Sequence, residues 1–280
     1  MLPKIVQFTT YLIDLDGVVY RGEELIPGAK EFVNWLNSNH KKYLFLTNNS
    51  FASEAQIVAK LTRLGIPTDG SHVLGAAQAA VIHITHHFPG AHVYIVGEQP
   101  LFDLVRANGL QIANPGSDKV QMINTSSHKT DVVLVGLDRT FDYKKLTEAV
   151  LAVRAGARFI AINRDSLLPV EDGFIAGCGT MAAAIEAGSG VTPEVVGKPQ
   201  PMLLQEAMRL LGSRQEETVM IGDGLDTDIL AGKAAGTHTL LVLSGKDSRE
   251  SLQKAHIKPD YVYENLAAVM QEIEMSPEIC

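Results

Sequence analysis

The sequence predicts an α/β protein with a Rossmann-like parallel sheet and helices on both faces. Two observations lead to this fold class. Short runs that are apolar throughout alternate with stretches of helical periodicity, and fully apolar strands are typical of parallel sheets whose two faces are covered. No fixed-period repeat and no sustained heptad pattern occurs, which argues against a solenoid and a coiled coil.

The individual elements follow in order along the chain. Apolar runs predict strands at residues 11–15, 42–47, 92–97, 131–136, 158–163, 217–222 and 238–243. Helical patterns follow most of these runs, at about 28–39, 53–64, 76–87, 100–108, 143–156, 180–188, 202–211 and 226–235. Ser53 and Gln56 are the two ends of a capping box, SEAQ, which marks the start of the second helix.

The composition excludes several classes of function. The net charge is −8 and basic residues form no run, so a nucleic-acid partner is not expected. No uninterrupted apolar run approaches the roughly 20 residues that cross a bilayer, so no membrane partner is expected either. The two cysteines, Cys178 and Cys280, lie far apart in the sequence and suggest neither a disulfide framework nor a zinc site. A reducing, cytoplasmic location fits this cysteine usage.

Polar residues that handle phosphate or metal follow four apolar runs at the points where those runs end. They are Asp14 and Asp16 in YLIDLD, Thr47 and Asn48 in YLFLTN, Lys198 after PEVVG, and Asp223 after TVMIG. In open α/β sheets, ligands bind outside the carboxyl ends of the strands. We therefore expect these residues to converge at one edge of the sheet.

This set of side chains suits phosphoryl transfer. Three carboxylates with oxygen chemistry around them favour a hard divalent cation, and Mg2+ is bound by one or two carboxylates together with water and a phosphate. Lys198 adds a point charge, and Thr47 and Asn48 add donors that stabilise charge on a phosphoryl group. One aspartate can attack phosphorus, and a neighbouring carboxyl can protonate the leaving oxygen and later activate water.

Each motif taken alone has an ordinary structural explanation. A D-x-D-G sequence commonly marks the boundary between a strand and a turn, and TNNS is commonly a loop with a helix cap. Carboxylates in GDGLDTD, residues 222–228, are favourable near a helix N-terminus whatever their function. The functional prediction depends on the ordered set.

That ordered set resembles the haloacid dehalogenase superfamily of phosphatases. DLDGVVY at 14–20 matches the family's first motif, TNNS at 47–50 its second, GKPQPM at 197–202 its third and GDGLDTD its fourth. Three further stretches are similar to the NagD-like and p-nitrophenyl phosphatase branch, subfamily IIA. They are GLDRTFDYKKLTEA, GARFIAINRD and AGCGTMAAAIEAGSG.

The resemblance implies a role for each matching residue. Asp14 would be the nucleophile and a Mg2+ ligand, and Asp16 would be the general acid and base that also gives its backbone carbonyl to the metal. Asp223 would be the third metal ligand, and Asp228 a partner of the metal's water molecules. Thr47 and Asn48 would bind the phosphate, and Lys198 would be the cation that steadies Asp14 and the phosphoryl group. Gly17 would let the chain turn sharply beneath the phosphate. A departing alkoxide needs a proton and a halide does not, so Asp16 favours phosphate esters over haloalkanoates.

The spacing of the motifs predicts a second domain. About 30 residues separate Asp16 from Thr47, whereas about 150 separate Thr47 from Lys198. We expect a discontinuous hydrolase core at residues 1–77 and 184–280, with an α/β cap at 78–183 inserted between the second and third motifs. This agrees with the larger type of cap that the family places after its second motif. Such a cap would exclude water and select the leaving group.

The cap region departs from the family pattern at one loop. Where the family often has Thr-Asn-Pro-Asp, this chain has Ile162, Asn163, Arg164 and Asp165, so the loop carries a cation and lacks a proline. We expect Asn163, Arg164 or Asp165 to face the substrate or to brace the cap; a solvated loop is the alternative for Arg164.

Two other patterns in this region predict no cofactor. His83, His86 and His87 have no adjacent acidic or cysteine partner, so a cap helix is a better interpretation than a metal site. No dinucleotide or Walker spacing occurs, so no nucleotide cofactor is indicated.

The sequence therefore predicts a Mg2+-dependent phosphatase. It would hydrolyse small phosphomonoesters, such as sugar phosphates, nucleoside monophosphates or p-nitrophenyl phosphate, through an aspartyl-phosphate intermediate. A homodimer through the cap is a family-level expectation. The alternatives are a phospho-accepting receiver-like signalling module, a non-catalytic binding protein on the same fold, and a phosphotransferase or mutase. Phosphotransferase relatives typically carry a cap between the first two motifs, where this chain has no room.

Overall fold

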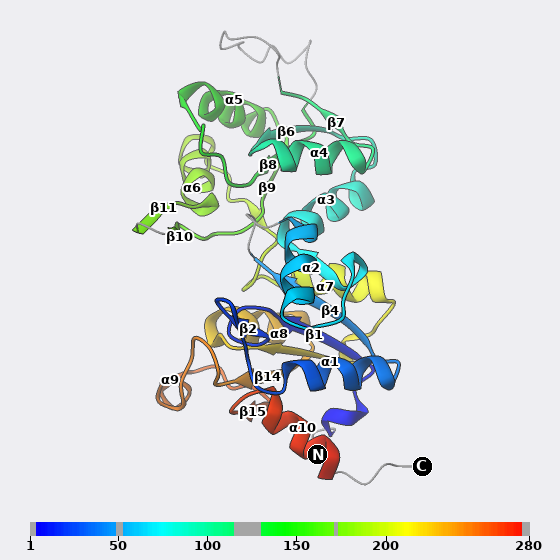
Figure 1. Ribbon diagram of the computed structural model, residues 1–280. Helices are drawn as coiled ribbons and strands as arrows, with labels where there is room; N and C mark the ends of the chain where they lie inside the picture. Colours follow the sequence, from blue (N-terminus) through cyan, green and yellow to red (C-terminus); the bar gives the residue numbers. More distant parts are fainter. Residues whose placement is uncertain (1–3, 49–52, 115–129, 171–172, 276–280) are drawn as a thin grey trace. The chain divides into compact units, whose positions relative to one another are not determined.

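Two parallel β-sheets, each flanked by helices, form the described part of the chain in the computed structural model (Figure 1). The structure describes residues 4–48, 53–114, 130–170 and 173–275. Contacts divide the chain into two units. The first, here the core unit, comprises Met1–Thr47, Ala52–Gly75 and Lys198–Cys280, and the second, here the inserted unit, comprises Asn48–Phe51 and Ala76–Gly197.

The core unit contains a six-stranded sheet in the order β15-β14-β13-β1-β4-β5, and every neighbouring pair is parallel. Its strands are β1 (Thr10–Asp14), β4 (Lys42–Thr47), β5 (Val73–Gly75), β13 (Thr218–Gly222), β14 (His238–Val242) and β15 (Tyr261–Tyr263). β1 lies between β13 and β4, with Asp14 in register with Leu46. The predicted fold class, a Rossmann-like α/β sheet, is confirmed.

Helices cover the core sheet, so the side chains of its central strands are buried. They are α1 (Ala29–Ser38), α2 (Glu54–Arg63), α7 (Met202–Leu211), α8 (Leu230–Ala235), α9 (Arg249–Lys254) and α10 (Leu266–Met275). Tyr11 and Ile13 of β1 join the buried cluster that includes Phe32 of α1 and Val269 of α10. α7 packs beside α8 and contacts β1 and β4. Successive side chains of a strand point to opposite faces, so each face of β1 has its own apolar partners.

Short elements complete the core unit. They are the 3-10 helices at Ile5–Gln7, Gly70–His72 and Gln215–Glu217, the antiparallel pair β2 (Tyr20–Arg21) and β3 (Glu24–Leu25), and a π-helical turn at Leu225–Ile229. The pair β2–β3 follows β1 almost directly. The π-helical turn runs straight into α8, so the helix predicted at 226–235 begins in a wider turn than expected.

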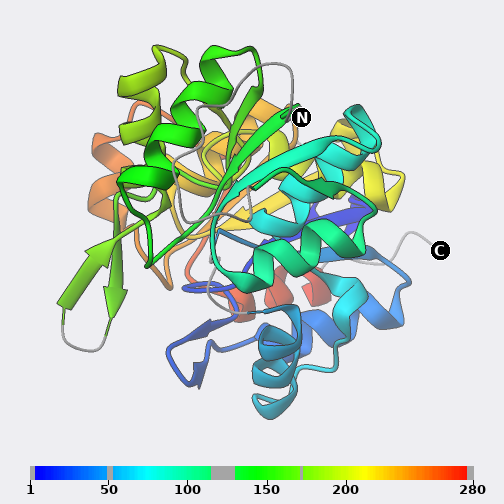
Figure 2. The ribbon, with the colours of Figure 1, turned by 90° about the horizontal axis from the view of Figure 1, so that it is seen from above.

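The inserted unit contains a five-stranded parallel sheet in the order β12-β9-β8-β6-β7. Its elements are α3 (Ala76–His87), β6 (His92–Val96), α4 (Gln99–Ala107), β7 (Gln111–Ile112), β8 (Val132–Val135), α5 (Tyr143–Arg154), β9 (Arg158–Ala161), α6 (Cys178–Ser189) and β12 (Glu194–Val195). α3 packs beside α4, and α5 beside α6. The antiparallel hairpin of β10 (Leu167–Val170) and β11 (Gly173–Ala176) extends away from the sheet (Figure 2).

The division into units differs from the predicted one at more than one place. Asn48, Ala76 and Ala77, expected in the core, are grouped with the inserted unit, and so are residues 184–197. α6 runs without a break from Cys178 to Ser189, and β12 pairs with β9, so this stretch is tied to the second sheet.

All seven predicted strands and all eight predicted helices have counterparts in the structure. The strands β5, β7, β12 and β15 and both hairpins were not predicted as such, because strands of two to four residues are too short to show an alternation. The helices α9 and α10 were also missed. Among the described helices, none combines the length and the apolar character needed to span a bilayer.

Gly28, the residue before α1, lies close to the backbone at the start of α10. Gly28 has φ +85°, and a Cβ built there would lie 2.0 Å from the backbone nitrogen of Ala267. We expect Gly28→Ala to lower the free energy of unfolding by about 3 kcal/mol, because strain and a backbone clash combine. Gly65 is the matched control: its φ is +83°, but the nearest atom to a Cβ would be Lys30 Nζ at 3.7 Å. Gly65→Ala should cost only about 1 kcal/mol in urea unfolding; equal losses for the two variants would contradict the packing argument.

Candidate active site

The candidate site lies at the carboxyl edge of the core sheet, where parallel strands end together. Asp14 is the last residue of β1, Thr47 the last of β4, and Asp223 follows directly after β13. β1 pairs with both β4 and β13, so these three positions are brought to one edge as the sequence predicted. Their convergence depends only on strand order and direction.

Lys198 is the centre of the site's charge arrangement. Its Nζ donates to Asp14 Oδ1 at 2.5 Å and to Asp228 Oδ1 at 2.6 Å. The side chains of Lys198 and Asp228 are only 4% and 2% exposed, so this is a buried ion triad. Burial opposes the charge of Lys198, but the Asp14 and Asp228 carboxylates outweigh it and raise the pKa of the ammonium group. Lys198 therefore stays protonated.

Lys198 does not reach the site as the sequence pattern suggested. The short strand before it, β12, belongs to the sheet of the inserted unit, so the prediction that four strands of one sheet deliver the site is wrong for Lys198. Lys198 is the first residue of the core unit after the chain leaves the inserted unit at Gly197.

Asp228 is aimed at Lys198 by the π-helical turn. Its Oδ2 accepts hydrogen bonds from the Gly224 backbone N–H at 3.1 Å and from Thr227 Oγ1 at 3.2 Å. A Cβ on Gly222 would lie 2.1 Å from the Asp228 Cβ, so only glycine fits beneath the carboxylate. Close packing against Asp228 thus explains Gly222 of GDGLDTD, and close approach to Thr227 Oγ1 explains Gly224.

Asp223 is held by the segment that follows β14. Its Oδ2 accepts the backbone N–H of Lys246 at 2.7 Å. Burial raises the pKa of Asp223 to about 6, although the Lys246 amide opposes the shift. Gly17 has φ +79°, and a Cβ there would lie 2.0 Å from Asp223 Oδ2, so the turn after β1 requires glycine for both reasons.

The residues present fit a divalent cation. One carboxylate oxygen from each of Asp14, Asp223 and Asp228 can be chosen so that all three lie within 4.8 Å of one another. Burial raises the pKa of Asp14, Lys198 opposes this, and the charges of Asp228 and Asp223 add to it. When all three carboxyls are ionised, a single ammonium group leaves an excess of negative charge that a hard cation would balance. Asp228, expected to be a partner of the metal's water molecules, also bonds Lys198 and has a carboxylate oxygen in the cluster.

Asp16 lies outside this cluster. Its side chain is exposed, and its backbone bridges to Tyr20 at the start of the β2–β3 hairpin. Partial burial raises the pKa of Asp16, whereas the charges of Lys60 and Lys198 lower it. An accessible carboxyl two residues from Asp14 is what proton transfer to a leaving group requires.

The predicted phosphate-binding pair divides between the units. Thr47 is buried at the end of β4, whereas Asn48 is grouped with the inserted unit. The Asn48 carbonyl oxygen accepts the Asn163 side-chain amide at 3.2 Å. Asn49 and Ser50 of the TNNS motif lie outside the described residues.

The three loop residues predicted to face the substrate or brace the cap follow β9. Asn163 is buried, and its Oδ1 accepts the Asp165 backbone N–H at 3.2 Å. Arg164 Nη1 donates to Glu186 Oε2 of α6 at 2.7 Å. Arg164 therefore has a partner inside the inserted unit, and any contact of the three residues with substrate stays a prediction.

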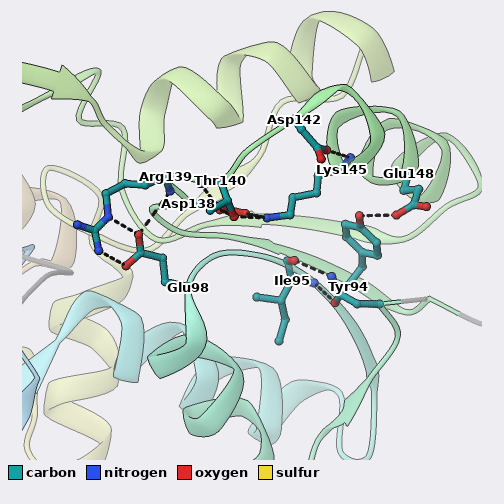
Figure 3. Close-up of polar contacts among 10 residues, drawn as sticks. Tyr94, Ile95, Glu98, Asp138, Arg139, Thr140, Asp142, Lys145 and Glu148 are labelled. Atoms are coloured by element: carbon teal, nitrogen blue, oxygen red, sulfur yellow. Dashed lines mark hydrogen bonds and ion pairs between the residues drawn. The ribbon is translucent and has the colours of Figure 1, made fainter. Parts of the chain in front are cut away.

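The sheet of the inserted unit also carries acidic residues at its carboxyl edge, but bases neutralise them locally (Figure 3). Glu98, after β6, accepts Arg139 Nε at 2.6 Å and Nη2 at 3.0 Å. Asp138, after β8, accepts Lys145 Nζ at 2.7 Å and Thr140 Oγ1 at 2.7 Å. Glu98 and Asp138 thus each have a basic partner of their own, whereas Asp14 and Asp228 share Lys198.

The three histidines belong to the last turns of α3, as expected from the helical pattern. The rings of His83 and His87 stack with their centroids 4.2 Å apart, and the ring of His86 contacts that of His87 edge-on. No function is assigned to them.

The segment after β14 was not recognised from the sequence as part of the site. Lys246 supplies the amide that binds Asp223, and this segment follows a run, 238–243, that was predicted as a strand. Asp14 and Asp223 were found because they follow predicted strands, and residues 244–247 also follow one. Their sequence, Ser-Gly-Lys-Asp, carries no familiar phosphate or metal motif.

Comparison with known proteins agrees with this geometry. Residues 11–111 match the family model of haloacid dehalogenase-like hydrolases, and residues 195–269 match a second HAD-hydrolase-like model. An acid sugar phosphatase of Staphylococcus epidermidis is 36% identical over 267 residues, which cover 95% of this chain and 98% of that protein.

Solved structures give the same result. A mutant of the thermostable p-nitrophenylphosphatase from Bacillus stearothermophilus superposes with a TM-score of 0.82 at 39% identity, covering 93% of this chain and 97% of that one. NagD from E. coli K-12 superposes with a TM-score of 0.81 at 31% identity, covering 93% and 98%.

The chain therefore belongs to the haloacid dehalogenase-like hydrolases. Within that family it belongs to the branch of NagD and the p-nitrophenyl phosphatases, as the motifs indicated. The prediction of an enzyme, a hydrolase of phosphoric monoesters, is confirmed.

The buried triad makes Lys198 a residue on which stability depends. Lys198→Met leaves Asp14 and Asp228 buried without their shared cation, so in EDTA at pH 7.5 we expect the free energy of unfolding to fall by about 3 kcal/mol. The loss should shrink as the pH is lowered, because protonation of either carboxyl removes an unpaired charge. Lys254→Met, which breaks an exposed pair with Glu250, is the control and should cost well under about 1 kcal/mol. A Lys198→Met variant as stable as the wild type at pH 7.5 would refute the assignment.

Proposed function

We propose that this protein is a Mg2+-dependent phosphatase that hydrolyses small phosphomonoesters through an aspartyl-phosphate intermediate. The observation that carries the proposal is the buried Lys198 ammonium group bound to Asp14 and Asp228. A carboxylate oxygen of Asp223 lies within 4.8 Å of one from each of these two residues, so a single metal ion could contact all three. Acid sugar phosphatases and p-nitrophenyl phosphatases match nearly the whole chain, which supports both the reaction and the substrate class.

The residues proposed to hold Mg2+ are Asp14 and Asp223 through their carboxylates and Asp16 through its backbone carbonyl. When bound, the ion would screen these carboxylates from the incoming phosphate dianion and withdraw charge from the phosphoryl oxygens. Asp228 is proposed to contact the ion through water, because its Oδ1 is bonded to Lys198.

In the first step an Asp14 oxygen attacks phosphorus, and the bond between phosphorus and the ester oxygen breaks. Lys198 holds Asp14 Oδ1, which fixes the carboxylate for attack and offsets charge on the phosphoryl group. The protonated Asp16 carboxyl gives its proton to the departing oxygen. Thr47 and Asn48 are proposed to donate to the phosphoryl oxygens.

In the second step Asp16, now a carboxylate, takes a proton from a water molecule that attacks phosphorus. The bond between phosphorus and Asp14 breaks, phosphate leaves, and the Asp14 carboxylate is restored. The two carboxylates thus have separate roles, since Asp14 forms the covalent bond and Asp16 moves the proton.

We propose sugar phosphates as the first substrates to test, followed by nucleoside monophosphates and p-nitrophenyl phosphate. In this proposal the inserted unit is the cap that selects the leaving group, with Asn163, Arg164 and Asp165 as candidates for contact. A homodimer through the cap and a cytoplasmic location stay predictions. The receiver-like alternative is disfavoured, because the similarity to phosphatases extends over 95% of the chain.

The central test is phosphate release from a panel of these esters. Wild-type protein should release phosphate with Mg2+ and stop when EDTA is added. Asp14→Asn should reduce kcat at least about a thousandfold, because an amide is a far poorer nucleophile. Circular dichroism confirms that the variant is folded, and Asp103→Asn on the exposed surface of α4 is the control for loss of a carboxylate. Turnover that survives chelation would remove the metal from the mechanism.

Asp16 is tested by the dependence on leaving group. Asp16→Asn should slow hydrolysis of alkyl phosphates much more than that of p-nitrophenyl phosphate, whose phenolate leaves without a proton. With p-nitrophenyl phosphate, stopped-flow absorbance should show a burst of about one p-nitrophenolate per active site, because water attack on the phosphorylated Asp14 then lacks its base. Equal losses on both ester types, without a burst, would argue against proton transfer by Asp16.

A further inference from the structure

Residues 243–247 follow β14 and lie against Asp223. The backbone N–H of Lys246 donates to Asp223 Oδ2 at 2.7 Å, and the backbone N–H of Asp247 donates to the Asp223 carbonyl oxygen at 3.1 Å. Two successive amides therefore hold the side chain and the main chain of one acidic residue.

Asp247 also holds the chain just beyond Asp223. Its Oδ2 accepts the Leu225 backbone N–H at 2.7 Å. Asp247 is thus tied to residues 223–225 as donor through its backbone and as acceptor through its carboxylate. These bonds join the segment after β13 to the segment after β14.

The same segment packs against the turn that follows β1. A Cβ on Gly245 would lie 1.9 Å from Asp223 Oδ2, and one on Gly17 would lie 2.0 Å from the same oxygen. Ser244 Oγ donates to the Gly17 carbonyl oxygen at 2.7 Å. Arg21 Nη2 donates in turn to the Ser244 carbonyl oxygen at 2.5 Å. Asp223 Oδ2 is therefore enclosed by two glycines and an amide.

We propose that residues 244–247 are a positioning element for the metal site, with Asp247 as its central residue. By occupying Asp223 Oδ2, the element leaves Oδ1 as the oxygen that faces Asp14 and the cation. It also couples Asp223 to the turn whose carbonyl, at Asp16, is a proposed ligand. The inference rests on the proposed function in taking Asp223 as a metal ligand. Residues that orient metal ligands typically change metal affinity about 10- to 100-fold when removed.

Titration calorimetry with MgCl2 tests the element in the absence of any phosphate ester. Asp247→Ala should weaken Mg2+ binding about tenfold or more, because the chain just after Asp223 loses the hydrogen bond that fixes Leu225. Asp247→Asn should bind close to wild type, since its amide oxygen still accepts the Leu225 N–H. This pair separates position from charge. Glu250→Gln removes one carboxylate from the adjacent helix α9, where Glu250 pairs with Lys254, and should bind as wild type.

Gly245→Ala gives a second measurement that changes no charge. Its methyl group would displace Asp223 Oδ2, so Mg2+ affinity should fall as in Asp247→Ala. Circular dichroism and urea unfolding in EDTA check that each variant folds, and if Asp247→Ala does not, Gly245→Ala carries the test.

The inference is overturned if Asp247→Ala and Gly245→Ala bind Mg2+ as tightly as wild type, or if Asp247→Asn is as weak as Asp247→Ala. Wild type that binds Mg2+ but releases no phosphate would refute the proposed function and leave this inference standing. Wild type without Mg2+ binding would overturn both.

Discussion

The ammonium group of Lys198, buried between the carboxylates of Asp14 and Asp228, is the interaction on which the rest of the site depends. Two carboxylates at the edge of an apolar sheet repel each other and lose their hydration, which is unfavourable unless a cation lies between them. Lys198 supplies that cation from a part of the chain distant in sequence from Asp14. Lys198, in the third motif, thus joins the first motif at Asp14 to the fourth at Asp228.

The excess of negative charge that remains explains why the site suits a divalent cation and a phosphate together. With all three carboxyls ionised, one ammonium group leaves the cluster anionic, and a phosphate dianion approaches an anionic cluster only when a counter-ion is present. The same excess distributes the roles of the acidic residues. Asp14 and Asp223 face the cluster, whereas Asp16 remains exposed and free to exchange protons. Function here follows from unequal environments of similar side chains.

The glycines of the site have a common physical cause, which is close approach to carboxylates. Gly17 and Gly245 border Asp223, and Gly222 lies beneath Asp228. No side chain fits at these positions, so the backbone itself surrounds the acidic groups and offers them its amides. This packing fixes the orientation of the carboxylates without ordering further side chains. A site that holds a small ion requires ligands with such a fixed orientation.

The sequence by itself determined the parallel α/β class, the ordered motifs and the residues Asp14, Asp16, Thr47 and Asp223 at or just beyond strand ends. The apolar runs and their alternation with helices can be read along the chain. Only the tertiary structure decided how Lys198 arrives, since its preceding strand β12 joins a different sheet. It also decided that Asp228 bonds Lys198 and that residues 244–247 hold Asp223. Those contacts are set by the geometry of a π-helical turn and by backbone amides, which are present at nearly every residue and leave no mark in the order of side chains.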